Sequence, residues 1–277
     1  PGYGGAIFRE SCTDTLWVLN SVISNNSGAN GGAIYSGSTN STLSIINSDI
    51  TGNEAASGIG GGIYSYGNDT SVVLVNNSNI SGNQANTGGG IFSRSDFYSY
   101  VSVNNSTISE NTALAYGGGG IASSSSASFS SSSTVLVNNS TISGNIANDE
   151  GGGIYSYSGG SSSYTLLSTV EVNNSTISGN EATIGGGIRS YADYSMTNST
   201  SSVSAINSTI TGNTATIKGA GISSGGYILP MNLTSSIVAN YSAVSNINNI
   251  LTNTNTTVDI NSNGYNVGWM SSGEWMN

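Results

Sequence analysis

A repeating pattern of apolar and polar positions runs along the whole chain. An isoleucine followed three residues later by an asparagine recurs eight times, and 27 to 35 residues separate successive isoleucines. We take this isoleucine as position zero of each repeat. The eight isoleucines are Ile23, Ile50, Ile80, Ile108, Ile142, Ile177, Ile210 and Ile237. Self-similarity at this period predicts one structural unit stacked repeatedly along an axis.

Alternation within each repeat predicts short β-strands. Apolar residues occupy positions minus seven and minus five, as in Val135 and Val137, whereas the residue between them varies in character. A glycine-rich motif ending in isoleucine, such as GGGI at 151–154, comes about a dozen residues after position zero. A column of small residues precedes that motif: Ala55, Ala85, Ala113, Ala147, Ala182 and Ala215. A period of two is typical of strands, and no segment shows a helical period of sufficient length.

A repeat of about 27 residues cannot bury its apolar face alone, so its coils must stack. The sequence therefore predicts an all-β fold, a single-stranded right-handed parallel β-helix (β-solenoid) of about eight coils with three short strands per coil. The right hand follows from the handedness of parallel crossovers. We expect the parallel β-helix over residues 1–237, and an irregular C-terminal cap or subunit-joining segment of the same domain over 238–277.

Asparagine forms two regular columns in the repeat. Asparagine tolerates left-handed backbone, and its amide can bond the identical amide one coil away. We predict that the column three residues after position zero is a structural ladder rather than a ligand site. Its members are Asn26, Asn53, Asn83, Asn111, Asn145, Asn180, Asn213 and Asn240. A second column, three residues before position zero, is expected to repeat the device at the opposite turn: Asn20, Asn47, Asn77, Asn105, Asn139, Asn174 and Asn207.

Three consecutive coils are longer than the others between the glycine motif and the next position zero. Their extra residues lie at 123–133, 156–165 and 193–202. Contiguous insertions on one side are where solenoids place binding surfaces. We predict that Tyr157, Tyr164, Tyr191 and Tyr194 form this surface, and the alternative is a flexible serine-rich fringe.

The residue after each glycine-motif isoleucine is aromatic in five coils. These residues are Phe8, Tyr35, Tyr64, Phe92 and Tyr155, and alternation places them on the outside. Such a stack shields the sheet or engages sugars and partner proteins. Shielding is the interpretation that we favour.

Composition and charge restrict the possible partners. The chain has 277 residues with 4 basic and 14 acidic side chains, a net charge of -10, 39 glycines and one cysteine. Binding to nucleic acid needs clustered Lys and Arg, which the chain does not have. No stretch is long and apolar enough for a membrane span, so we expect no membrane insertion. The chain opens on Pro1 without a signal peptide, and we interpret it as a mature product or a fragment.

The residues that enzymes and metal sites require are sparse. Histidine is absent, which excludes histidine-based triads and metal sites. Pairs such as Arg189 with Asp193 are expected to be surface ion pairs, and Asp149 with Glu150 a solvated turn. We therefore predict no catalytic residues, no cofactor and no metal. The alternatives are a carbohydrate-active β-helix enzyme of the polysaccharide lyase type and an ice-binding β-solenoid, the latter from Thr-Ile-Ser segments such as 141–143.

The two motifs resemble those of a known family. GG[AG]I, as in GGGI at 118–121, and IxxN, as in ISGN at 142–145, are similar to the repeats of polymorphic outer-membrane proteins, with Ile in place of their Phe. The closing stretch also resembles the last coils of adhesin-like β-helix proteins of prokaryotic surfaces. The resemblance implies an extracellular or cell-surface location and a structural or adhesive role.

Two further expectations concern contacts and modification. The first coil offers an open strand edge, which favours a second copy of the chain as partner, stacked head to tail or laterally. The alternative partner is a glycan or protein ligand on a surface. Many Asn-x-Ser/Thr windows occur because the repeats are rich in these residues. Those in loops are the predicted glycosylation acceptors: Asn40, Asn68 and Asn198.

Overall fold

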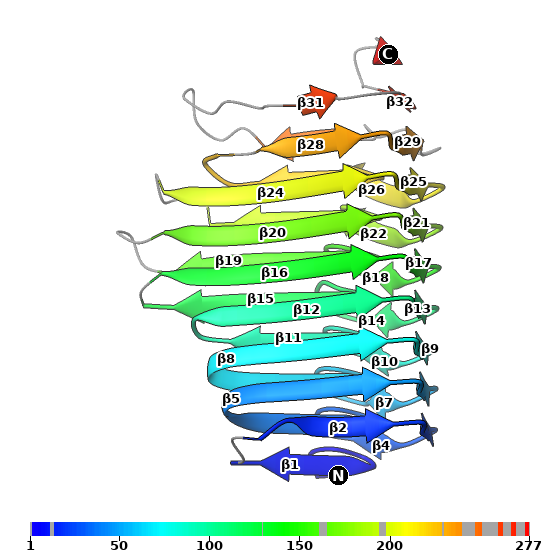
Figure 1. Cartoon of the computed structure of the whole chain (residues 1–277), viewed down its shortest axis with the longest axis vertical. Coiled ribbons are helices and arrows are strands. Elements are labelled where there is room, and N and C mark those ends of the chain that lie inside the picture. The colour runs from blue at the N-terminus through cyan, green and yellow to red at the C-terminus, as the bar shows by residue number, and fades with distance from the viewer. Residues whose placement is uncertain are drawn as a thin grey trace.

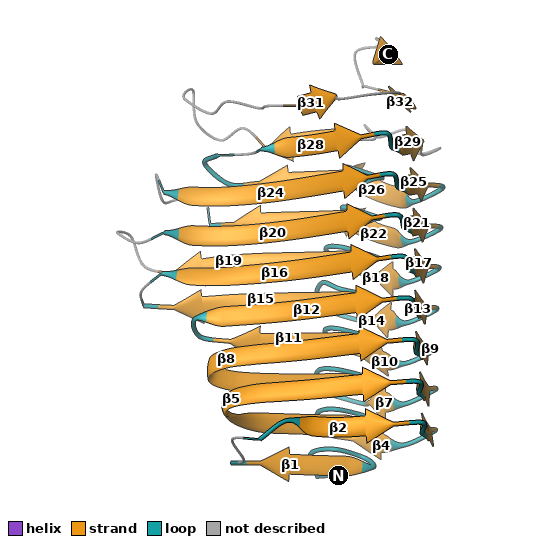
Figure 2. Ribbon diagram, in the orientation of Figure 1, coloured by secondary structure: helices purple, strands orange, loops and turns teal. Residues whose placement is uncertain are grey.

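The chain folds into a stack of coils around one axis (Figures 1 and 2). The computed structural model describes residues 2–11, 14–128, 130–160, 165–193, 198–228 and 230–239, and the backbone of 247–250, 260–262, 267–269 and 275–276. All regular structure in these residues is β-strand. The front strands in Figure 1 run left to right while the chain rises from its N-terminus, which is the sense of a right-handed coil. The predicted right-handed parallel β-helix is confirmed.

The strands form three sheets of 16, 10 and 7 strands. The largest sheet contains a back leg and a front leg, which are continuous in β5 (Ile34–Ile46) and β8 (Ile63–Asn76). The other back-leg strands are β1 (Ile7–Glu10), β11 (Ile91–Ser95), β15 (Ile121–Ala127), β19 (Ile154–Gly160), β23 (Ile188–Ala192), β27 (Ile222–Gly225) and β30 (Ile247–Ile250). The other front-leg strands are β2 (Leu16–Leu19), β12 (Tyr98–Asn104), β16 (Ser131–Asn138), β20 (Leu166–Asn173), β24 (Ser199–Ile206), β28 (Met231–Thr234) and β31 (Ile260–Ser262).

The two remaining sheets are built from very short strands. The 10-stranded sheet contains β3 (Val22–Ser24), β6 (Asp49–Thr51), β9 (Asn79–Ser81), β13 (Thr107–Ser109), β17 (Thr141–Ser143), β21 (Thr176–Ser178), β25 (Thr209–Thr211), β29 (Ile237–Ala239), β32 (Val267–Trp269) and the antiparallel β33 (Trp275–Met276). The 7-stranded sheet contains β4 (Ser27–Gly28), β7 (Glu54–Ala55), β10 (Gln84–Ala85), β14 (Thr112–Ala113), β18 (Ile146–Ala147), β22 (Glu181–Ile184) and β26 (Thr214–Lys218).

Identical positions of neighbouring coils pair in register. Ile108 pairs with Ile80 on one side and Ile142 on the other, and all three are fully buried. The columns at minus seven and minus five belong to the same core, as predicted, with Leu16 partly buried at its end. The alanines of the 7-stranded sheet are buried too, and Ala113, Ala147 and Ala182 form a separate cluster. Each coil is therefore stabilised mainly by burying its apolar face against its neighbours.

The last coil that the isoleucine motif marks is shifted by one residue from the prediction, and β30, β31 and β32 pair with it from the coil that follows. Val238 pairs with Ile210 and is buried, whereas Ile237 pairs with Thr209 and is 44% exposed. Position zero is therefore Val238, and the assignment of Ile237 is wrong. Buried Met231 and Leu233 stand seven and five residues before Val238, so the apolar columns of the front leg determine the register.

The plus-three asparagines are joined from coil to coil. Nδ2 of each amide donates to Oδ1 of the next at 2.9–3.0 Å, from Asn26 through to Asn213. Nδ2 of Asn145 also donates to the carbonyl oxygen of Ile108 at 3.0 Å, which satisfies a backbone group at the turn. Asn240, the eighth member predicted from the sequence, lies outside the described residues.

The minus-three asparagines differ from the prediction. All seven have left-handed backbone, with φ of 48–50°, but their side chains are exposed. One amide bond joins two of them, from Asn47 to Asn20 at 3.2 Å. The serine that follows each asparagine makes the contact between coils instead: the backbone nitrogen of Ser140, for example, donates to Oγ of Ser175 at 3.0 Å. Serine at position minus two is therefore the ladder at this turn.

Part of the serine-rich insertions is internal. Thirteen serine hydroxyls form one continuous hydrogen-bonded chain between the front and back legs, with Oγ–Oγ distances of 2.8–3.0 Å and at most 1% exposure. Its members are Ser36, Ser41, Ser65, Ser71, Ser93, Ser99, Ser123, Ser133, Ser156, Ser168, Ser190, Ser201 and Ser224. The two legs approach so closely that small side chains fill the space, and pairing makes their burial tolerable. Four of the thirteen come from the insertions, Ser123, Ser133, Ser156 and Ser201, and these four are internal and not part of a fringe.

Candidate binding surface

Many of the aromatic side chains and two of the basic ones, Arg94 and Arg189, lie on the outward side of the back leg. We call this surface the aromatic face and define it by two columns that the strand register aligns. The first column is Phe8, Tyr35, Tyr64, Phe92, Ala122, Tyr155, Arg189 and Ser223. The second column is Glu10, Gly37, Tyr66, Arg94, Ser124, Tyr157, Tyr191 and Gly225. In Figure 1 this face lies on the far side of the back-leg strands β11, β15 and β19.

The first column stacks, but much of it is covered. Ring centroids lie 5.2 Å apart for Phe8 and Tyr35, 5.4 Å for Tyr35 and Tyr64, and 5.6 Å for Tyr64 and Phe92. Phe8 is half exposed, whereas Tyr35, Tyr64 and Phe92 are each only 7% exposed. Alternation correctly placed these rings outside the core, and three of the four are covered there. The rings form a second apolar cluster with Ile59 and Tyr66 packed against it, so they shield the sheet.

Small residues make room for the rings on this face. A β-carbon on Gly117 would lie 2.9 Å from the ring of Tyr155, and one on Gly159 would lie 2.2 Å from the hydroxyl of Tyr157. Ala122 stands in place of a ring in the coil below Tyr155, and Tyr155 packs against the cluster that contains it. The order of large and small residues along the two columns therefore determines where each ring lies.

The structure brings together two of the four tyrosines predicted to bind. Tyr157 of β19 and Tyr191 of β23 are paired in register, and their rings stack at 5.7 Å with an interplanar angle of 20°. Tyr155 lies 6.3 Å from Tyr157 and is nearly parallel to it. Both predicted tyrosines are partly exposed. Tyr164 and Tyr194 lie outside the described residues.

Arg189 anchors this stack. Its side chain is buried, its Nη1 donates to Oγ of Ser223 at 3.0 Å, and its guanidinium lies 4.8 Å from the ring centroid of Tyr191. Its Nε lies 3.3 Å from Oε1 of Glu150, an ion pair outside hydrogen-bond geometry. Arg189 is therefore a buried partner of Glu150, and Glu150 is not simply a solvated turn. The sequence did not reveal the pair because its two residues come from successive coils.

The same group of charges acts on two other side chains. Burial first, and then the negative charge of Glu150, raises the pKa of Tyr155 well above its usual value, and the tyrosine hydroxyl also hydrogen-bonds to that carboxylate. Burial first, and then the positive charge of Arg189, lowers the pKa of Lys218, against the opposing effect of Glu150. Two of the four basic residues of the chain therefore influence each other at this point.

Alkaline pH should weaken the fold through its buried tyrosines. Because the pKa of Tyr155 is raised above its ordinary value of 10.0, the unfolded chain loses this proton first. The stability contributed by the neutral hydroxyl is then fully present below pH 10 and decreases as pH rises further. We expect the denaturation midpoint to fall above about pH 10, and to fall less steeply in Tyr155→Phe. Identical pH profiles for both proteins would contradict this account.

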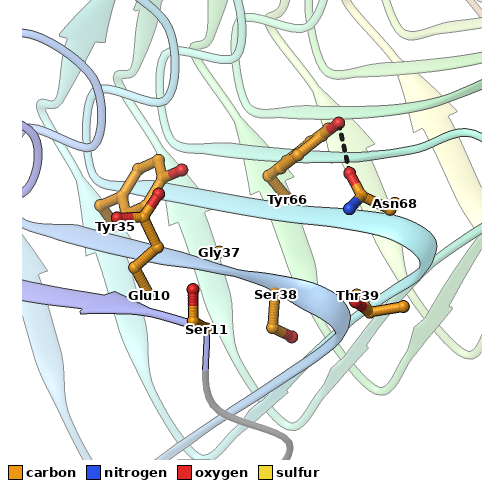
Figure 3. A pocket seen from close by; sticks show the side chains of 8 residues that line it. All are labelled: Glu10, Ser11, Tyr35, Gly37, Ser38, Thr39, Tyr66 and Asn68. Atoms are coloured by element: carbon orange, nitrogen blue, oxygen red, sulfur yellow. Dashed lines mark hydrogen bonds between the residues drawn. The ribbon is translucent and has the colours of Figure 1, made fainter.

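A polar groove interrupts the aromatic face near its N-terminal end (Figure 3). Its volume is about 260 Å³ and its opening faces solvent. Gly37 lies between Glu10 and Tyr66 in the second column, so the column has no side chain at this point. The remaining lining residues come from the wall and the corner of the coils: Ser11, Tyr35, Ser38, Thr39 and Asn68. The groove was not predicted from the sequence. Aligning the third residue after each glycine-motif isoleucine shows that Gly37 interrupts a column of larger residues.

The three predicted glycosylation acceptors lie at one corner of the solenoid. Asn40 in β5, Asn68 in β8 and Asn198 before β24 are all exposed where the back leg meets the front leg. Asn68 also accepts a hydrogen bond from the hydroxyl of Tyr66 at 2.8 Å. Their glycosylation stays a prediction.

Metal clusters and membrane-spanning helices are both absent from the described residues. Among these residues, no group of three or more His, Cys, Asp or Glu side chains has an arrangement that could hold a metal ion. The part of the chain that the structure describes likewise contains no helix of the length and apolarity needed to cross a membrane.

The segment that is similar to a known protein family lies in the middle of the stack. Residues 139–157 contain β17, β18, one glycine turn and β19 as far as Tyr157, and they match the model of the Chlamydia polymorphic membrane protein repeat. Part of one coil of this chain is similar to that repeat. The match covers a single short repeat, and the register of the structure shows that the neighbouring coils are built in the same way. Comparisons with curated proteins and with solved structures gave no match.

Proposed function

We propose that this chain is a non-catalytic β-helix of the cell surface or extracellular space, with a structural and adhesive role. The observation that supports this most is the partly exposed stack of Tyr157 and Tyr191 on the aromatic face, anchored by buried Arg189. Tyrosine and arginine are the residues that most often dominate binding energy at contact surfaces. Similarity of one coil to the polymorphic membrane protein repeat supports the proposed location.

The rod itself supports a mechanical role. Amide and hydroxyl ladders run along the axis inside the described coils, and nearly every strand is paired on both sides. A solenoid held in this way resists local opening because breaking one coil exposes polar groups in two neighbours. Such a scaffold holds a contact surface at a fixed distance and orientation.

The arrangement of charged groups favours contact over catalysis. Glu150 and Arg189 neutralise each other beneath the tyrosines, so this carboxylate is held by a structural partner. Glycoside hydrolysis needs two carboxylates converging on one bond, and elimination needs a base beside bound substrate. Glu10 is the single acidic side chain that lines the groove. These observations support the non-enzymatic role over the lyase alternative.

Adhesion of coated beads tests the proposed function. Beads carrying the chain are expected to bind an epithelial monolayer or a mucin layer, and Tyr157→Ala/Tyr191→Ala should reduce the bound number at least about fivefold, because it removes two aromatic contacts. Beads that clump without cells would identify a second copy of the chain as the partner, and the same variant should then abolish clumping.

The front leg offers a matched control. Tyr98 and Tyr100 form another ring pair, with centroids 6.1 Å apart, on β12. Tyr98→Ala/Tyr100→Ala should leave adhesion unchanged. Equal loss in the two double variants, or no adhesion by the unaltered chain to cells, mucin or itself, would overturn the proposal.

A further inference from the structure

We propose that the groove at Gly37 binds one pyranose sugar that lacks a carboxylate. The inference deepens the proposed adhesive function and rests on it, since it assigns a ligand class to a second contact on the same face. The tyrosine stack of Tyr157 and Tyr191 is four coils away along the axis, so the two sites can be tested separately.

The groove arises from a missing side chain in a regular column. Glu10, Gly37 and Tyr66 occupy the same position in three successive coils, so roughly two coil spacings, about 9–10 Å, separate the flanking residues. The ring of Tyr35 leans over the glycine, where an added β-carbon would lie 2.7 Å from its hydroxyl.

The lining matches the chemistry of a sugar. Tyr66 offers aromatic surface for the C–H groups of a pyranose ring, and the largely covered Tyr35 lines the groove on the other side in Figure 3. The carboxylate of Glu10 accepts hydrogen bonds, while hydroxyl and amide groups of Ser11, Thr39 and Asn68 can donate or accept. A ligand that carries many hydroxyls on a small ring satisfies such a mixed set.

One lining contact holds the amide in place. The hydroxyl of Tyr66 donates to Oδ1 of Asn68 at 2.8 Å, which orients the Asn68 amide at the rim of the groove. An oriented amide loses less entropy when a ligand binds, so this pair prepares the site for recognition.

Size and charge narrow the ligand class. About 260 Å³ is slightly below the range of pockets for drug-sized molecules, about 300–1,000 Å³, and suits a single ring at the end of a glycan. Glu10 is the one charged side chain among the lining residues, and its field, after burial, contributes to the raised pKa of Tyr35. A sugar carboxylate would face this charge on a chain of net charge -10, so neutral and amino sugars are favoured.

Saturation-transfer NMR on the full chain tests the inference with methyl β-galactoside, N-acetylglucosamine and glucuronic acid as probes. At least one neutral probe should bind with a Kd on the order of 1–10 mM, and glucuronic acid about tenfold more weakly. Gly37→Leu should abolish binding because its side chain either fills the groove or displaces the Tyr35 ring that lines it. Glu10→Gln should weaken binding about tenfold by removing a charge-assisted bond. Ser124→Leu, in the same column but away from the groove, should bind like the unaltered chain.

Two results would overturn the inference. The first is no binding of either neutral probe by the unaltered chain, and the second is equal binding by Gly37→Leu, which would place the sugar elsewhere. Bead adhesion that still depends on Tyr157 and Tyr191 would leave the proposed function standing in both cases. The circular dichroism spectrum of Gly37→Leu must match that of the unaltered chain, and Glu10→Gln tests the site without adding bulk.

Discussion

Gly152→Ala is expected to open the solenoid at its middle. Gly152 is buried in the turn before β19, and a β-carbon there would lie 2.4 Å from the carbonyl oxygen of Glu181 and 2.5 Å from that of Gly186. Both atoms are backbone of the next coil, so no side-chain rotation can relieve the overlap. We expect a loss of about 4 kcal/mol or more, at the upper end for single substitutions. Urea denaturation followed by circular dichroism measures it.

Gly179→Ala provides the control for backbone strain. Gly179 has a φ of +63°, but an added β-carbon would meet its nearest neighbour, the backbone nitrogen of Gly144, only at 3.9 Å. The cost is then that of a left-handed alanine alone, about 1 kcal/mol. Similar losses for the two alanine variants would contradict the close packing of coils at the glycine turns.

Asn145→Ala should produce the second large loss of stability. The Asn145 amide donates to Oδ1 of Asn180 at 2.9 Å and to the carbonyl of Ile108 at 3.0 Å. Its Oδ1 accepts from the backbone nitrogen and the amide of Asn111, both at 3.0 Å. Alanine leaves these partners buried and unpaired, so we expect a loss of about 3–5 kcal/mol in the free energy of unfolding.

An asparagine of the same coil is the matched control for the ladder. Asn139 is exposed and has a φ of 48°, a conformation that glycine adopts without strain. Asn139→Gly should therefore change the free energy of unfolding by less than about 0.5 kcal/mol. A loss below about 1 kcal/mol in Asn145→Ala would show that the buried amides add little to stability.

The repeat explains why so much of the fold could be predicted. Each position that faces the apolar core recurs from one repeat to the next, so a single irregular residue does not obscure the pattern. The serine chain escaped prediction because Ser156 and Ser168 look like loop residues until the front and back legs are known to meet. The last coil was misplaced because Ile237 fits the motif, although the buried residues Met231 and Leu233 put Val238 in its place.

The candidate site was only partly predictable. The extra length of three coils pointed to Tyr157 and Tyr191, which the structure stacks against each other. Glu150 and Arg189 are 39 residues apart in the chain and meet because they lie in successive coils, which no local pattern shows. The groove depends on Gly37 lacking a side chain between two large neighbours, so it is recognised only after the coils are aligned.

Masking one face at a time tests most directly the claim that the aromatic face makes the functional contact. Cys12 would be replaced by serine, and a single cysteine would be introduced by Ser124→Cys on the aromatic face or by Thr134→Cys on the outward side of the front leg. Each protein would then be coupled to a polyethylene glycol chain before the bead assay. The account predicts that coupling at position 124 abolishes adhesion and coupling at 134 leaves it intact. Adhesion lost only when position 134 is masked, or unaffected by both, would contradict it.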